Sequence, residues 1–432
     1  MKYESWGRYP KADQTGSQLP AQPDSRVFSQ SKPNLPFGRG RSYGDVCLSS
    51  KGQLLDTRNM DSFLEFNRET GLMTCQSGVQ LGEILDLCMP AGWIIPVSPG
   101  TQFVTVGGAI ANDVHGKNHH IVGTFGRHLK AFELLRSDGQ RLICSPDDNV
   151  DLYKATIGGL GLTGLITWAQ IQLTKISGNS VSAEHIKFSN LTEYLALSDE
   201  SSTGYEYTVA WVDCMARNEK LGRGIFSRAN DSANYIDEKP SRTLSVPIDI
   251  PISMVNPLTI GAFNPLYANK QFTKHKNEIL PYRSFFYPLD SILHWNRVYG
   301  SAGFLQYQCV IPESERTCMF DILKVVSNSN MGSALAVLKT CGDLESPGLL
   351  SFPMKGLSLA LDFPFNGLST LKLFDELDRL VMSAGGRIYS AKDAHTSAQD
   401  FQKMYPMWEA LERQRDPAFL SDFWSRVTNQ TP

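Results

Sequence analysis

Two glycine-rich stretches near the amino end constrain this chain more than any other feature. Residues 38–45 read Gly-Arg-Gly-Arg-Ser-Tyr-Gly-Asp, and a longer stretch runs from Ser98 to His120. Glycine allows positive φ and lets backbone amides approach and surround an anion. Neither stretch is followed by a P-loop lysine or a hydrophobic helix. We therefore expect both to contact one large anionic ligand, and a dinucleotide fits that description.

The length and charge of the chain limit the classes of protein to consider. A chain of 432 residues is long enough for two domains. Its formal net charge of -3 gives no reason to expect nucleic acid binding, which needs concentrated Lys and Arg. The eight cysteines are scattered without a C-x-x-C pair, so they predict reduced thiols in a cytoplasmic protein. We expect no signal peptide, because the amino end lacks an apolar core segment.

The segment from Leu244 to Tyr267 carries one charge, Asp249, and is long enough to span a bilayer. Four prolines interrupt it, and a continuous helix would lose backbone hydrogen bonds at them. We therefore expect no transmembrane helix. Two interpretations stay open: a buried irregular loop, or an apolar lid that touches lipid or a lipid-like substrate.

Alternating apolar residues predict strands at 54–56, 63–66, 72–75 and 93–97, with an amphipathic helix at 79–89. Residues 159–164 match G-x-G-x-x-G, the fingerprint of a Rossmann site. That fingerprint requires a helix after it, whereas residues 165–173 alternate as a strand does. We therefore reject a Rossmann site and expect an α+β fold.

The second half of the chain continues this alternation. Residues 175–190 are polar and Ser-rich, which predicts a domain junction. Strands are expected at 205–213, 304–311, 335–339 and 357–362, and helices at 313–329 and 369–383. This pattern predicts a large antiparallel sheet backed by helices. Residues 385–393 predict a strand end that carries Tyr389 and Lys392, and helical sequence follows to the carboxyl end.

Polar side chains follow the small residues Gly107-Gly108-Ala109, which leave room for a planar ring. His115, His119 and His120 suggest a metal site, but Gly116 and Asn118 disfavour the helix that would make them converge. We therefore expect no metal, place His115 beside a ligand, and leave His119 or His120 as solvent-exposed. Lys392 is expected near the ligand, with a surface salt bridge to Asp393 as the alternative.

The two loops together resemble the flavin-binding domain of the vanillyl-alcohol oxidase superfamily. Residues 40–45, 104–120, 295–308 and 391–393 are similar to the decaprenylphosphoryl-β-D-ribose 2-oxidase family within it, and the similarity runs from Trp6 to the final helix. The resemblance implies a two-domain FAD-linked oxidase. Residues 1–177 would form a PCMH-type FAD-binding domain of two α+β subdomains, and residues 178–386 a substrate (cap) domain with an apolar loop at about 240–290. Residues 387–432 would return to the FAD-binding domain.

The resemblance also implies the flavin contacts. Relatives with covalent FAD often carry a histidine where this chain has Arg41, so we expect noncovalent FAD. The implied contacts are Pro36, Phe37, Gly38, Arg39, Gly40, Arg41, Ser42, Tyr43, Gly44, Asp45 and Val46 in the first loop, Gly100, Thr105, Val106, Gly107, Gly108, Asn112, Asp113, Val114 and His115 in the second, and Ile166 and Tyr389.

The family's active-site lysine falls on Lys392, with His115 and Tyr43 as further catalytic candidates. Lys117, Trp211, Gln306, Gln308 and Lys339 would line the substrate side. A family cysteine and an asparagine align with Ala360 and Ser358, so the thiol is absent here and the sugar is left open. The implied reaction oxidises a secondary sugar hydroxyl, the 2-hydroxyl of a polyprenyl-phosphoryl-β-D-ribose-like substrate, as in cell-wall polysaccharide biosynthesis.

Two other functions remain open at this point. The same scaffold would suit a sugar-lactone or alditol oxidase, or a tailoring oxidase of secondary metabolism, and a flavin-bearing binding protein is the non-enzyme alternative. By similarity, an NAD(P)H-dependent reductase partner would act on the keto sugar. The apolar loop suggests a peripheral contact with the inner face of the membrane.

Overall fold

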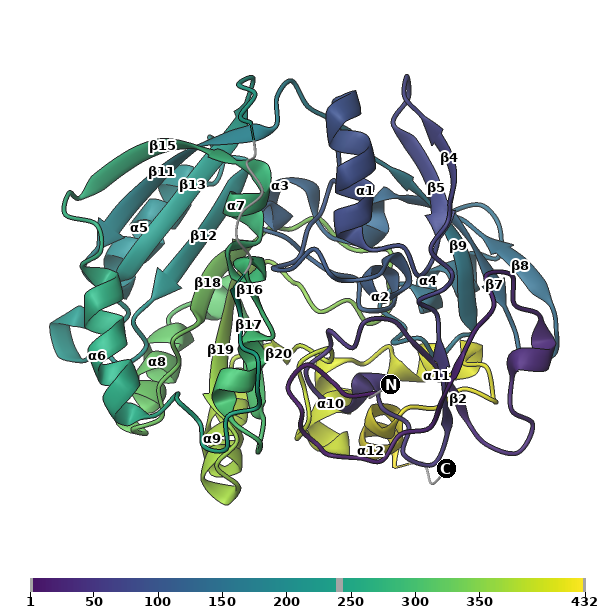
Figure 1. Ribbon diagram of the computed structural model, residues 1–432. Coiled ribbons are helices and arrows are strands. Elements are labelled where there is room, and N and C mark those ends of the chain that lie inside the picture. Colours follow the sequence, from purple (N-terminus) through teal and green to yellow (C-terminus); the bar gives the residue numbers. More distant parts are fainter. Residues whose placement is uncertain (1–2, 238–243, 430–432) are drawn as a thin grey trace.

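A computed structural model describes residues 3–237 and 244–429. One half of the molecule is built around a large antiparallel sheet, and the other contains two smaller sheets and most of the amino-terminal chain (Figure 1). The model is a mixture of helices and antiparallel sheet, which agrees with the expected α+β class.

The two smaller sheets carry the glycine-rich loops. A parallel sheet has the order β1-β3-β2, and an antiparallel sheet has the order β4-β5-β9-β7-β8. A two-stranded pair, β6 with β10, lies beside them. The strands are β1 (Gly16–Gln18), β2 (Asn34–Phe37), β3 (Gln53–Asp56), β4 (Phe63–Asn67), β5 (Leu72–Gln76), β6 (Trp93–Ile94), β7 (Leu129–Leu135), β8 (Arg141–Cys144), β9 (Leu165–Gln172) and β10 (Thr174–Lys175). The helices are α1 (Leu81–Cys88), α2 (Val106–Ala111), α3 (His119–Val122) and α4 (Val150–Thr156).

Helix α1 shows how the sequence determines these elements. Gln80 forms a capping box with Glu83, which satisfies amide groups that the first turn leaves unpaired. Leu81, Ile84, Leu85 and Cys88 follow at helical spacing and are completely buried against the antiparallel sheet. The helix therefore forms where the amphipathic pattern predicted it.

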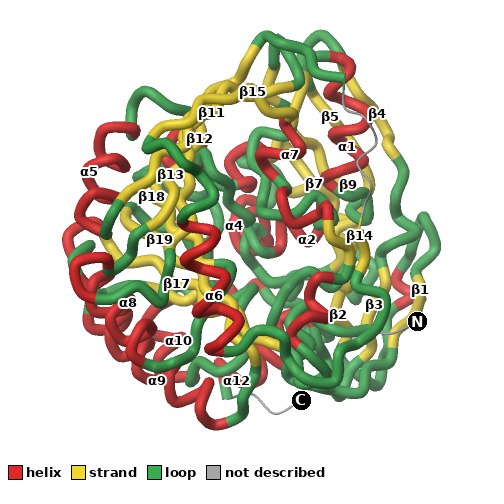
Figure 2. Tube along the Cα trace, turned by 60° about the vertical axis from the view of Figure 1, so that its left-hand side comes forward, coloured by secondary structure: helices red, strands yellow, loops and turns green. Residues whose placement is uncertain are grey.

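The large sheet has eight strands in the order β15-β11-β13-β12-β18-β19-β17-β20, and every pairing is antiparallel. The helices α5 (Leu191–Ser201), α8 (Cys318–Asn328) and α9 (Leu368–Ser383) cover one face, on the left in Figure 2. The strands are β11 (Ser180–Phe188), β12 (Tyr207–Val212), β13 (Gly224–Ser232), β15 (His275–Pro281), β17 (Phe304–Pro312), β18 (Ala336–Cys341), β19 (Gly356–Pro364) and β20 (Arg387–Ile388).

Alternation along these strands separates a core face from a polar face. Leu305 and Tyr307 on β17 and Leu359 and Leu361 on β19 are buried in the core that includes α8 and α9. Successive residues on a strand point to opposite faces, so the side chains between them point away from the helices. The polar face of the sheet is therefore free to line a site.

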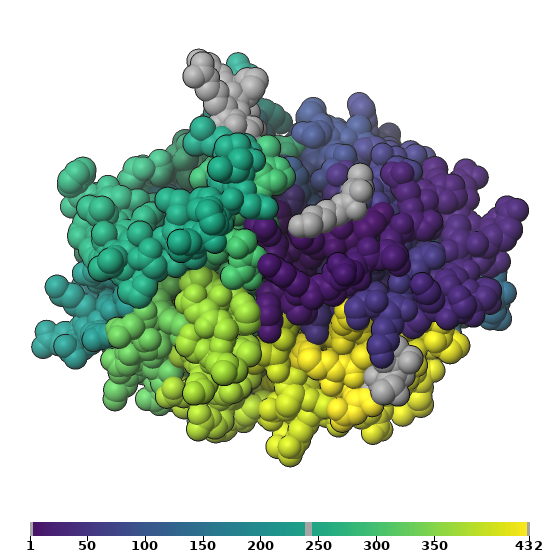
Figure 3. Space-filling view, turned by 60° about the horizontal axis from the view of Figure 1, so that its bottom comes forward, coloured from purple at the N-terminus to yellow at the C-terminus, as the bar shows by residue number. Residues whose placement is uncertain are grey.

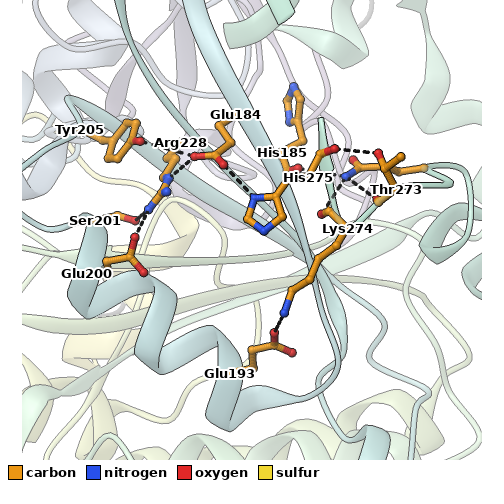
Figure 4. A network of polar contacts seen from close by, with 11 residues as sticks. Glu184, His185, Glu193, Glu200, Ser201, Tyr205, Arg228, Thr273, Lys274 and His275 are labelled. Carbon is orange, nitrogen blue, oxygen red and sulfur yellow. Dashed lines mark hydrogen bonds and ion pairs between the residues drawn. The ribbon is translucent and has the colours of Figure 1, made fainter. Parts of the chain in front are cut away.

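Within the polar stretch at 175–190 the chain passes from β10 to the large sheet, and most of the stretch forms β11. Its charged residues belong to a network at this end of the sheet (Figure 4). Arg228 on β13 donates to Glu184 on β11 at 2.7 Å and to Glu200 on α5 at 2.8 Å, and its guanidinium lies over the Tyr205 ring. His275 on β15 bonds to the other oxygen of Glu184 at 2.8 Å. These contacts explain why a polar sequence forms a strand here.

The apolar segment is exposed, so the alternative of a buried irregular loop is wrong. It contains β14 (Leu244–Ser245) and α6 (Pro257–Ala268), and α7 (Tyr282–Phe286) and β16 (Ile292–Leu293) follow. Ile252 is 80% exposed, Leu258 85% and Leu266 73%. Residues 240–243 of the expected loop lie outside the described residues. Within 3–237 and 244–429, no helix is both long and apolar enough to cross a membrane.

The carboxyl-terminal helices pack against the amino-terminal chain. They are α10 (Ala398–Met404), α11 (Trp408–Gln414) and α12 (Asp422–Thr428). Asn34 donates its backbone N–H to the carbonyl of Ala418 at 2.7 Å, and Asp422 donates to Leu48 at 2.8 Å. Figure 3 shows the yellow carboxyl-terminal residues directly against purple amino-terminal ones. Residues 389–397 therefore connect the large sheet to the half that carries the first glycine-rich loop.

Candidate active site

The glycines of the first loop mainly allow other parts of the chain to pack closely against its backbone, and only one of them has positive φ. Of Gly38, Gly40 and Gly44, only Gly40 has positive φ, at 61°. A Cβ on Gly38 would lie 2.5 Å from Thr105 Oγ1, so the two glycine-rich stretches touch each other there. A Cβ on Gly44 would lie 1.6 Å from the carbonyl oxygen of Asp393. This loop therefore has no run of positive-φ residues. Its glycines instead leave room for Thr105 and Asp393 to pack against the backbone.

The second stretch itself contains a short helix, α2. Helix α2 starts after Thr105, whose side chain accepts a hydrogen bond from the Gly108 N–H at 3.2 Å. Gly107 donates to the carbonyl of Ser77 at 2.8 Å, and its missing Cβ would lie 3.1 Å from Ser77 Cβ. Because Gly107 and Gly108 have no side chains, α2 can pack closely against β5 and β9.

Buried polar atoms along both loops have no hydrogen-bond partner within the described residues. They include Arg41 Nε in the first loop, Ser77 Oγ after β5, and Asn112 Oδ1 and His115 Nδ1 after α2, and also Asn118 Oδ1, His119 Nε2 and His120 Nδ1 at the end of the second stretch. Buried polar groups are nearly always paired in folded proteins, so a bound polar ligand would complete them. Around Gly100 a Cβ would meet nothing within 4 Å, which leaves open space beside the second stretch. These features fit a large polar cofactor.

Two acidic residues of the implied flavin set bind protein groups instead. Asp45 accepts from Arg426 Nε at 2.9 Å and from its terminal nitrogen at 2.8 Å. Asp113 accepts from the hydroxyls of Ser346 and Ser351, both at 2.5 Å. Their carboxylates therefore hold the loops in place.

The remaining implied flavin residues lie close to these two. Ile166 is buried with Val106 and Ala109 in the core below α2. Tyr389 donates from its hydroxyl to the carbonyl of Asn112 at 2.9 Å. Arg41 stacks over Trp6 at 4.1 Å and lies 5.1 Å from the Phe103 ring, and burial lowers the pKa of its guanidinium. The two loops and residue 389 thus border one region.

The polar face of the large sheet gathers the residues implied for the substrate side. Strand pairing places Trp211 opposite Val337, Lys339 opposite Ser358, and both Gln308 and Val337 opposite Ala360. Gln306 pairs with Asp362 in the same way. By alternation these side chains share the face that points away from α8 and α9. Trp211, Gln306, Gln308, Lys339, Ser358 and Ala360 are therefore brought together.

Lys392 extends toward this face from the segment after β20. Its Nζ lies 3.6 Å from the centre of the Tyr43 ring. Burial lowers the pKa of Lys392, the charge of Asp362 raises it, and Lys339 lowers it. The expected alternative, a surface salt bridge from Lys392 to Asp393, is wrong, because Asp393 pairs with Arg426 at 3.2 Å and with His395 at 3.0 Å.

His115 is buried between Gln308 and two aromatic rings. The Gln308 amide nitrogen lies 3.1 Å from His115 Nε2 and donates to it, so the proton of the neutral ring belongs on Nδ1. Burial, followed by the charges of Lys339, His119 and Lys392, lowers the pKa of His115. The ring is therefore a neutral donor at Nδ1.

Two further lysines carry depressed pKa values. Burial lowers the pKa of Lys117 to about 7, with a contribution from Lys339, and Lys117 Nζ donates to the carbonyl of Phe285. Burial also lowers the pKa of Lys339 to about 8. The charge of Lys339 is a further cause that lowers the pKa of both Lys117 and Lys392.

The histidines after His115 differ from the expectation of a solvent-exposed ring. His119 is buried and accepts from the Gly342 N–H at 3.1 Å, and His120 Nε2 bonds to the carbonyl of Tyr205 at 2.9 Å. Among the residues that the structure describes, no three His, Cys, Asp or Glu side chains are arranged to hold a metal ion.

Comparison with known proteins explains this arrangement. The model of the FAD binding domain family matches residues 27–145. The chain is 37% identical over 410 residues to decaprenylphosphoryl-β-D-ribose oxidase from Mycolicibacterium smegmatis, a match that covers 90% of this chain and 88% of the relative. The chain belongs to the decaprenylphosphoryl-β-D-ribose oxidase family. It is an FAD-dependent oxidoreductase of the vanillyl-alcohol oxidase superfamily, as the glycine-rich strings indicated.

Two other relatives show how the similarity is distributed. An uncharacterized protein from Streptomyces coelicolor, encoded in the mprA 5' region, is 30% identical over 370 residues, covering 81% of this chain and all of that protein. L-gulonolactone oxidase from Mus musculus is 28% identical over 145 residues, or 33% of this chain and 32% of its own. Of these three matches, the one to decaprenylphosphoryl-β-D-ribose oxidase has the highest identity, and it extends over both halves of the chain.

Two polar residues of this family member were missed by the sequence analysis. Ser77, whose hydroxyl is buried without a partner within the described residues, follows β5 beside Gly107. Asp362 ends the string 357–362 that alternation identified as a strand, and the period of two would have placed it on the same face as Ser358 and Ala360.

Proposed function

We propose that the protein oxidises a secondary hydroxyl of a polyprenyl-phosphoryl pentose, the 2-hydroxyl of a β-D-ribose, to a ketone. The observation that carries this proposal is the placement of three lysines near the flavin loops. Lys339 stands on the polar face of the sheet at β18, the Lys117 carbonyl accepts the Thr208 N–H of β12, and Lys392 lies after β20 against the Tyr43 ring. A phosphodiester supplies the negative charge that such a group would pair with. Bound FAD supplies the two-electron acceptor.

The residues would divide the work between binding and proton transfer. Lys117 and Lys339 would meet the phosphodiester, and Gln306 and Trp211 would contact the sugar. Lys392 is the first candidate for the group that takes the hydroxyl proton, because burial keeps part of its population neutral near pH 7. His115, whose buried Nδ1 has no hydrogen-bond partner within the described residues, would orient the sugar oxygen.

The substrate class is tested by single-turnover reduction of the flavin under anaerobic conditions. A short-chain polyprenyl-phosphoryl ribose should bleach the flavin absorbance at a concentration where free ribose, alditols and sugar lactones do not. Faster bleaching by a lactone or alditol would favour the sugar-lactone and alditol alternative. Flavin that no alcohol reduces would favour a binding protein. The keto sugar would then be the substrate of a separate NAD(P)H-dependent reductase.

We infer that the flavin is held without a covalent bond. Arg41 stands at the first-loop position, stacked on Trp6, and its guanidinium offers no nucleophile for flavin attachment. Acid precipitation should therefore release all FAD into the supernatant. Flavin fluorescence that stays with the denatured polypeptide on a gel would contradict the inference.

We infer also that the exposed apolar segment contacts a membrane surface from the cytoplasmic side. Ile252 and Leu258 are mostly exposed, and Phe272, shortly after the segment, is fully exposed with Lys270 and Lys274 two residues to either side of it. Apolar side chains with neighbouring cations are typical of segments that bind anionic lipid. A groove of about 350 Å³, lined partly by Ile252, Val255 and Phe365, lies in the same region and would suit an isoprenoid chain.

The membrane contact is tested by flotation with phosphatidylglycerol vesicles. The wild type should float with the vesicles, and the double variant Ile252→Asp, Leu258→Asp should stay in the dense fraction. A variant of the exposed Leu64 on β4, Leu64→Asp, serves as the control for an added charge on a distant apolar residue. Equal flotation of all three proteins, or of none, would contradict the contact.

A further inference from the structure

A pocket opens at the surface beyond the end of α6, and none of its lining residues belongs to the flavin or substrate sets described above. It encloses about 340 Å³. One wall lies where Phe188 at the end of β11 pairs with Gly224 at the start of β13, and the chain that follows α6 forms another. Within the described residues no acidic side chain lines it, whereas four cationic ones do: Lys187, Lys220, Arg223 and Lys274.

Two of the four cations are compensated by carboxylates outside the pocket. Arg223 donates to Asp213 Oδ2 at 3.0 Å through Nε and at 2.8 Å through a terminal nitrogen. Lys274 donates from Nζ to Glu193 on α5 at 2.7 Å, a contact visible in Figure 4. These pairs hold Arg223 and Lys274 in place and leave the charges of the other two cations unbalanced.

The remaining cations, Lys187 and Lys220, have no carboxylate partner within the described residues. Lys187 Nζ donates to the carbonyl of Gln271 at 3.1 Å and lies 3.5 Å from Asn269 Oδ1, and both of these acceptors are neutral. Lys220 is exposed at the end of a short 3-10 helix, and its ammonium contacts no described acceptor. The pocket therefore carries excess positive charge, which a phosphate group would balance.

The turn that bears Phe272 is held firmly at the rim of this pocket. Gln271 is buried, and its side-chain amide donates to the carbonyls of His185, Thr273 and Lys274 at 3.0, 3.0 and 3.1 Å. Phe272 is nevertheless fully exposed. An aromatic ring that a fixed turn keeps in water gains free energy when an apolar partner covers it. A partner with both an anion and an apolar part would satisfy the lysines and the ring together.

We propose that this pocket binds the phosphate of one anionic phospholipid, with Lys187 and Lys220 against the phosphate and the Phe272 ring among the acyl chains. Helix α6, whose Ala268 lines the pocket, continues the apolar surface through the exposed Leu266. The inference deepens the membrane contact and rests on that part of the proposed function, because it names the lipid group that orients the contact.

The alternative occupant is a soluble phosphate ester, which the lysines would bind equally well but which Phe272 would not contact. Two compounds separate these ligands: dihexanoyl phosphatidylglycerol below its micelle concentration, and glycerophosphoglycerol, the same headgroup without acyl chains. Binding of each to the FAD-loaded protein is measured by calorimetry. The lipid should bind about tenfold more tightly than the headgroup because it adds apolar burial, and added salt should weaken both.

Three variants assign the binding to the pocket. Lys220→Met, which replaces an exposed side chain, should weaken the binding of both compounds about fivefold. The double variant Lys187→Met, Lys220→Met should weaken both about twenty-fivefold. Phe272→Ser should weaken the lipid alone and bring its affinity close to that of the headgroup. The control Lys51→Met, Lys130→Met removes two exposed lysines from the other half of the molecule and should change neither affinity.

Two results would overturn the lipid assignment even if the double variant does not fold. Equal affinities for lipid and headgroup, unchanged in Phe272→Ser, would assign the pocket to a soluble phosphate ester. Equal weakening in Lys220→Met and in the control would show that the overall surface charge attracts the lipid, and not this pocket.

The same measurements separate this inference from the proposed function. If neither compound binds but the phosphoryl pentose bleaches the flavin, the inference fails and the proposed reaction stands. If the lipid binds as expected but the wild type does not float with vesicles, the pocket stands and the proposed contact through the apolar segment is wrong.

Discussion

Gly44 in the first glycine-rich loop lies directly against the backbone carbonyl of Asp393, the residue after Lys392. Because Tyr43 also donates its N–H to the carbonyl of Ala391 at 2.9 Å, the loop and the lysine segment are joined on both sides of Lys392. The position of the site lysine therefore depends on a residue without a side chain some 350 positions earlier in the sequence.

Replacing Gly44 with alanine should separate these two segments. A Cβ at 1.6 Å from a backbone oxygen forces the backbone to shift, and overpacking of this kind costs about 1–3 kcal/mol. We expect Gly44→Ala to lower both the melting temperature and the flavin absorbance per purified protein. Gly204→Ala is the control, since its Cβ would meet nothing within 4 Å. Full flavin content in Gly44→Ala would show that the loop tolerates the shift.

His395 should stabilise the fold in a pH-dependent way. Burial lowers its pKa, but hydrogen bonds with Asp378 and Asp393 outweigh burial and raise the pKa to about 10. A raised histidine pKa gives stability that is complete below the unfolded value of about 6.5 and is lost as pH rises toward 10. The difference in unfolding free energy between the wild type and His395→Asn, measured in urea, should therefore be largest near pH 6 and shrink by pH 10. A constant difference would show that the charge of His395 does not contribute.

Lys339 should make substrate binding weaken at alkaline pH. Burial lowers its pKa to about 8, and only the protonated amine pairs with a phosphodiester, whose own charge is constant in this range. Affinity for a polyprenyl phosphodiester, measured by calorimetry, should fall as pH rises through about 8. Lys339→Arg should bind across the whole range because arginine stays protonated, and Lys339→Met should bind about ten- to a hundredfold more weakly. Identical pH dependence in wild type and Lys339→Arg would exclude this role.

The network around Arg228 should affect stability and leave the chemistry unchanged. Arg228→Met removes charge-assisted hydrogen bonds to Glu184 and Glu200, and leaves Glu184 with His275 and the Tyr205 hydroxyl (Figure 4). We expect a loss of about 2–3 kcal/mol in unfolding free energy. The rate of flavin reduction should match the wild type, because the network lies at the β11 end of the sheet, away from β17 and β19. A changed rate of flavin reduction with an unchanged unfolding free energy would contradict this prediction.

The sequence predicted the core strands well because alternation is strong in them. Residues 357–362 alternate strictly, residues 305–309 alternate around Gln306 and Gln308, and the apolar side chains of both are buried on one face. Residues 180–188 were harder, since their charged side chains look like a linker until Arg228 and Glu184 are seen together. Likewise, the prolines of the apolar segment suggested a loop, but Pro257 occupies the first position of α6 after the cap Asn256, where proline is favoured.

Within the site, the sequence identified single residues better than their partners. Lys392 and Tyr43 were named as catalytic candidates, whereas Asp362 was not, because a fully buried carboxylate is rare and only its neighbours explain it. The salt bridge considered between Lys392 and Asp393 does not form, and here too the explanation is a partner that is distant in sequence. Arg426, 33 residues beyond Asp393, binds that carboxylate first, and no local pattern shows this.

The short strand β20 has a consequence for how substrate enters. Tyr389 donates its N–H to Gln308 on the large sheet, and only two residues later Ala391 accepts from Tyr43 in the flavin loop. A hinge opening between the two halves would pull these hydrogen bonds apart and carry Lys392 away from the sheet. We therefore expect the two halves to stay together through each catalytic cycle. A long lipid-linked sugar would then enter and leave through motion of residues 244–293 alone.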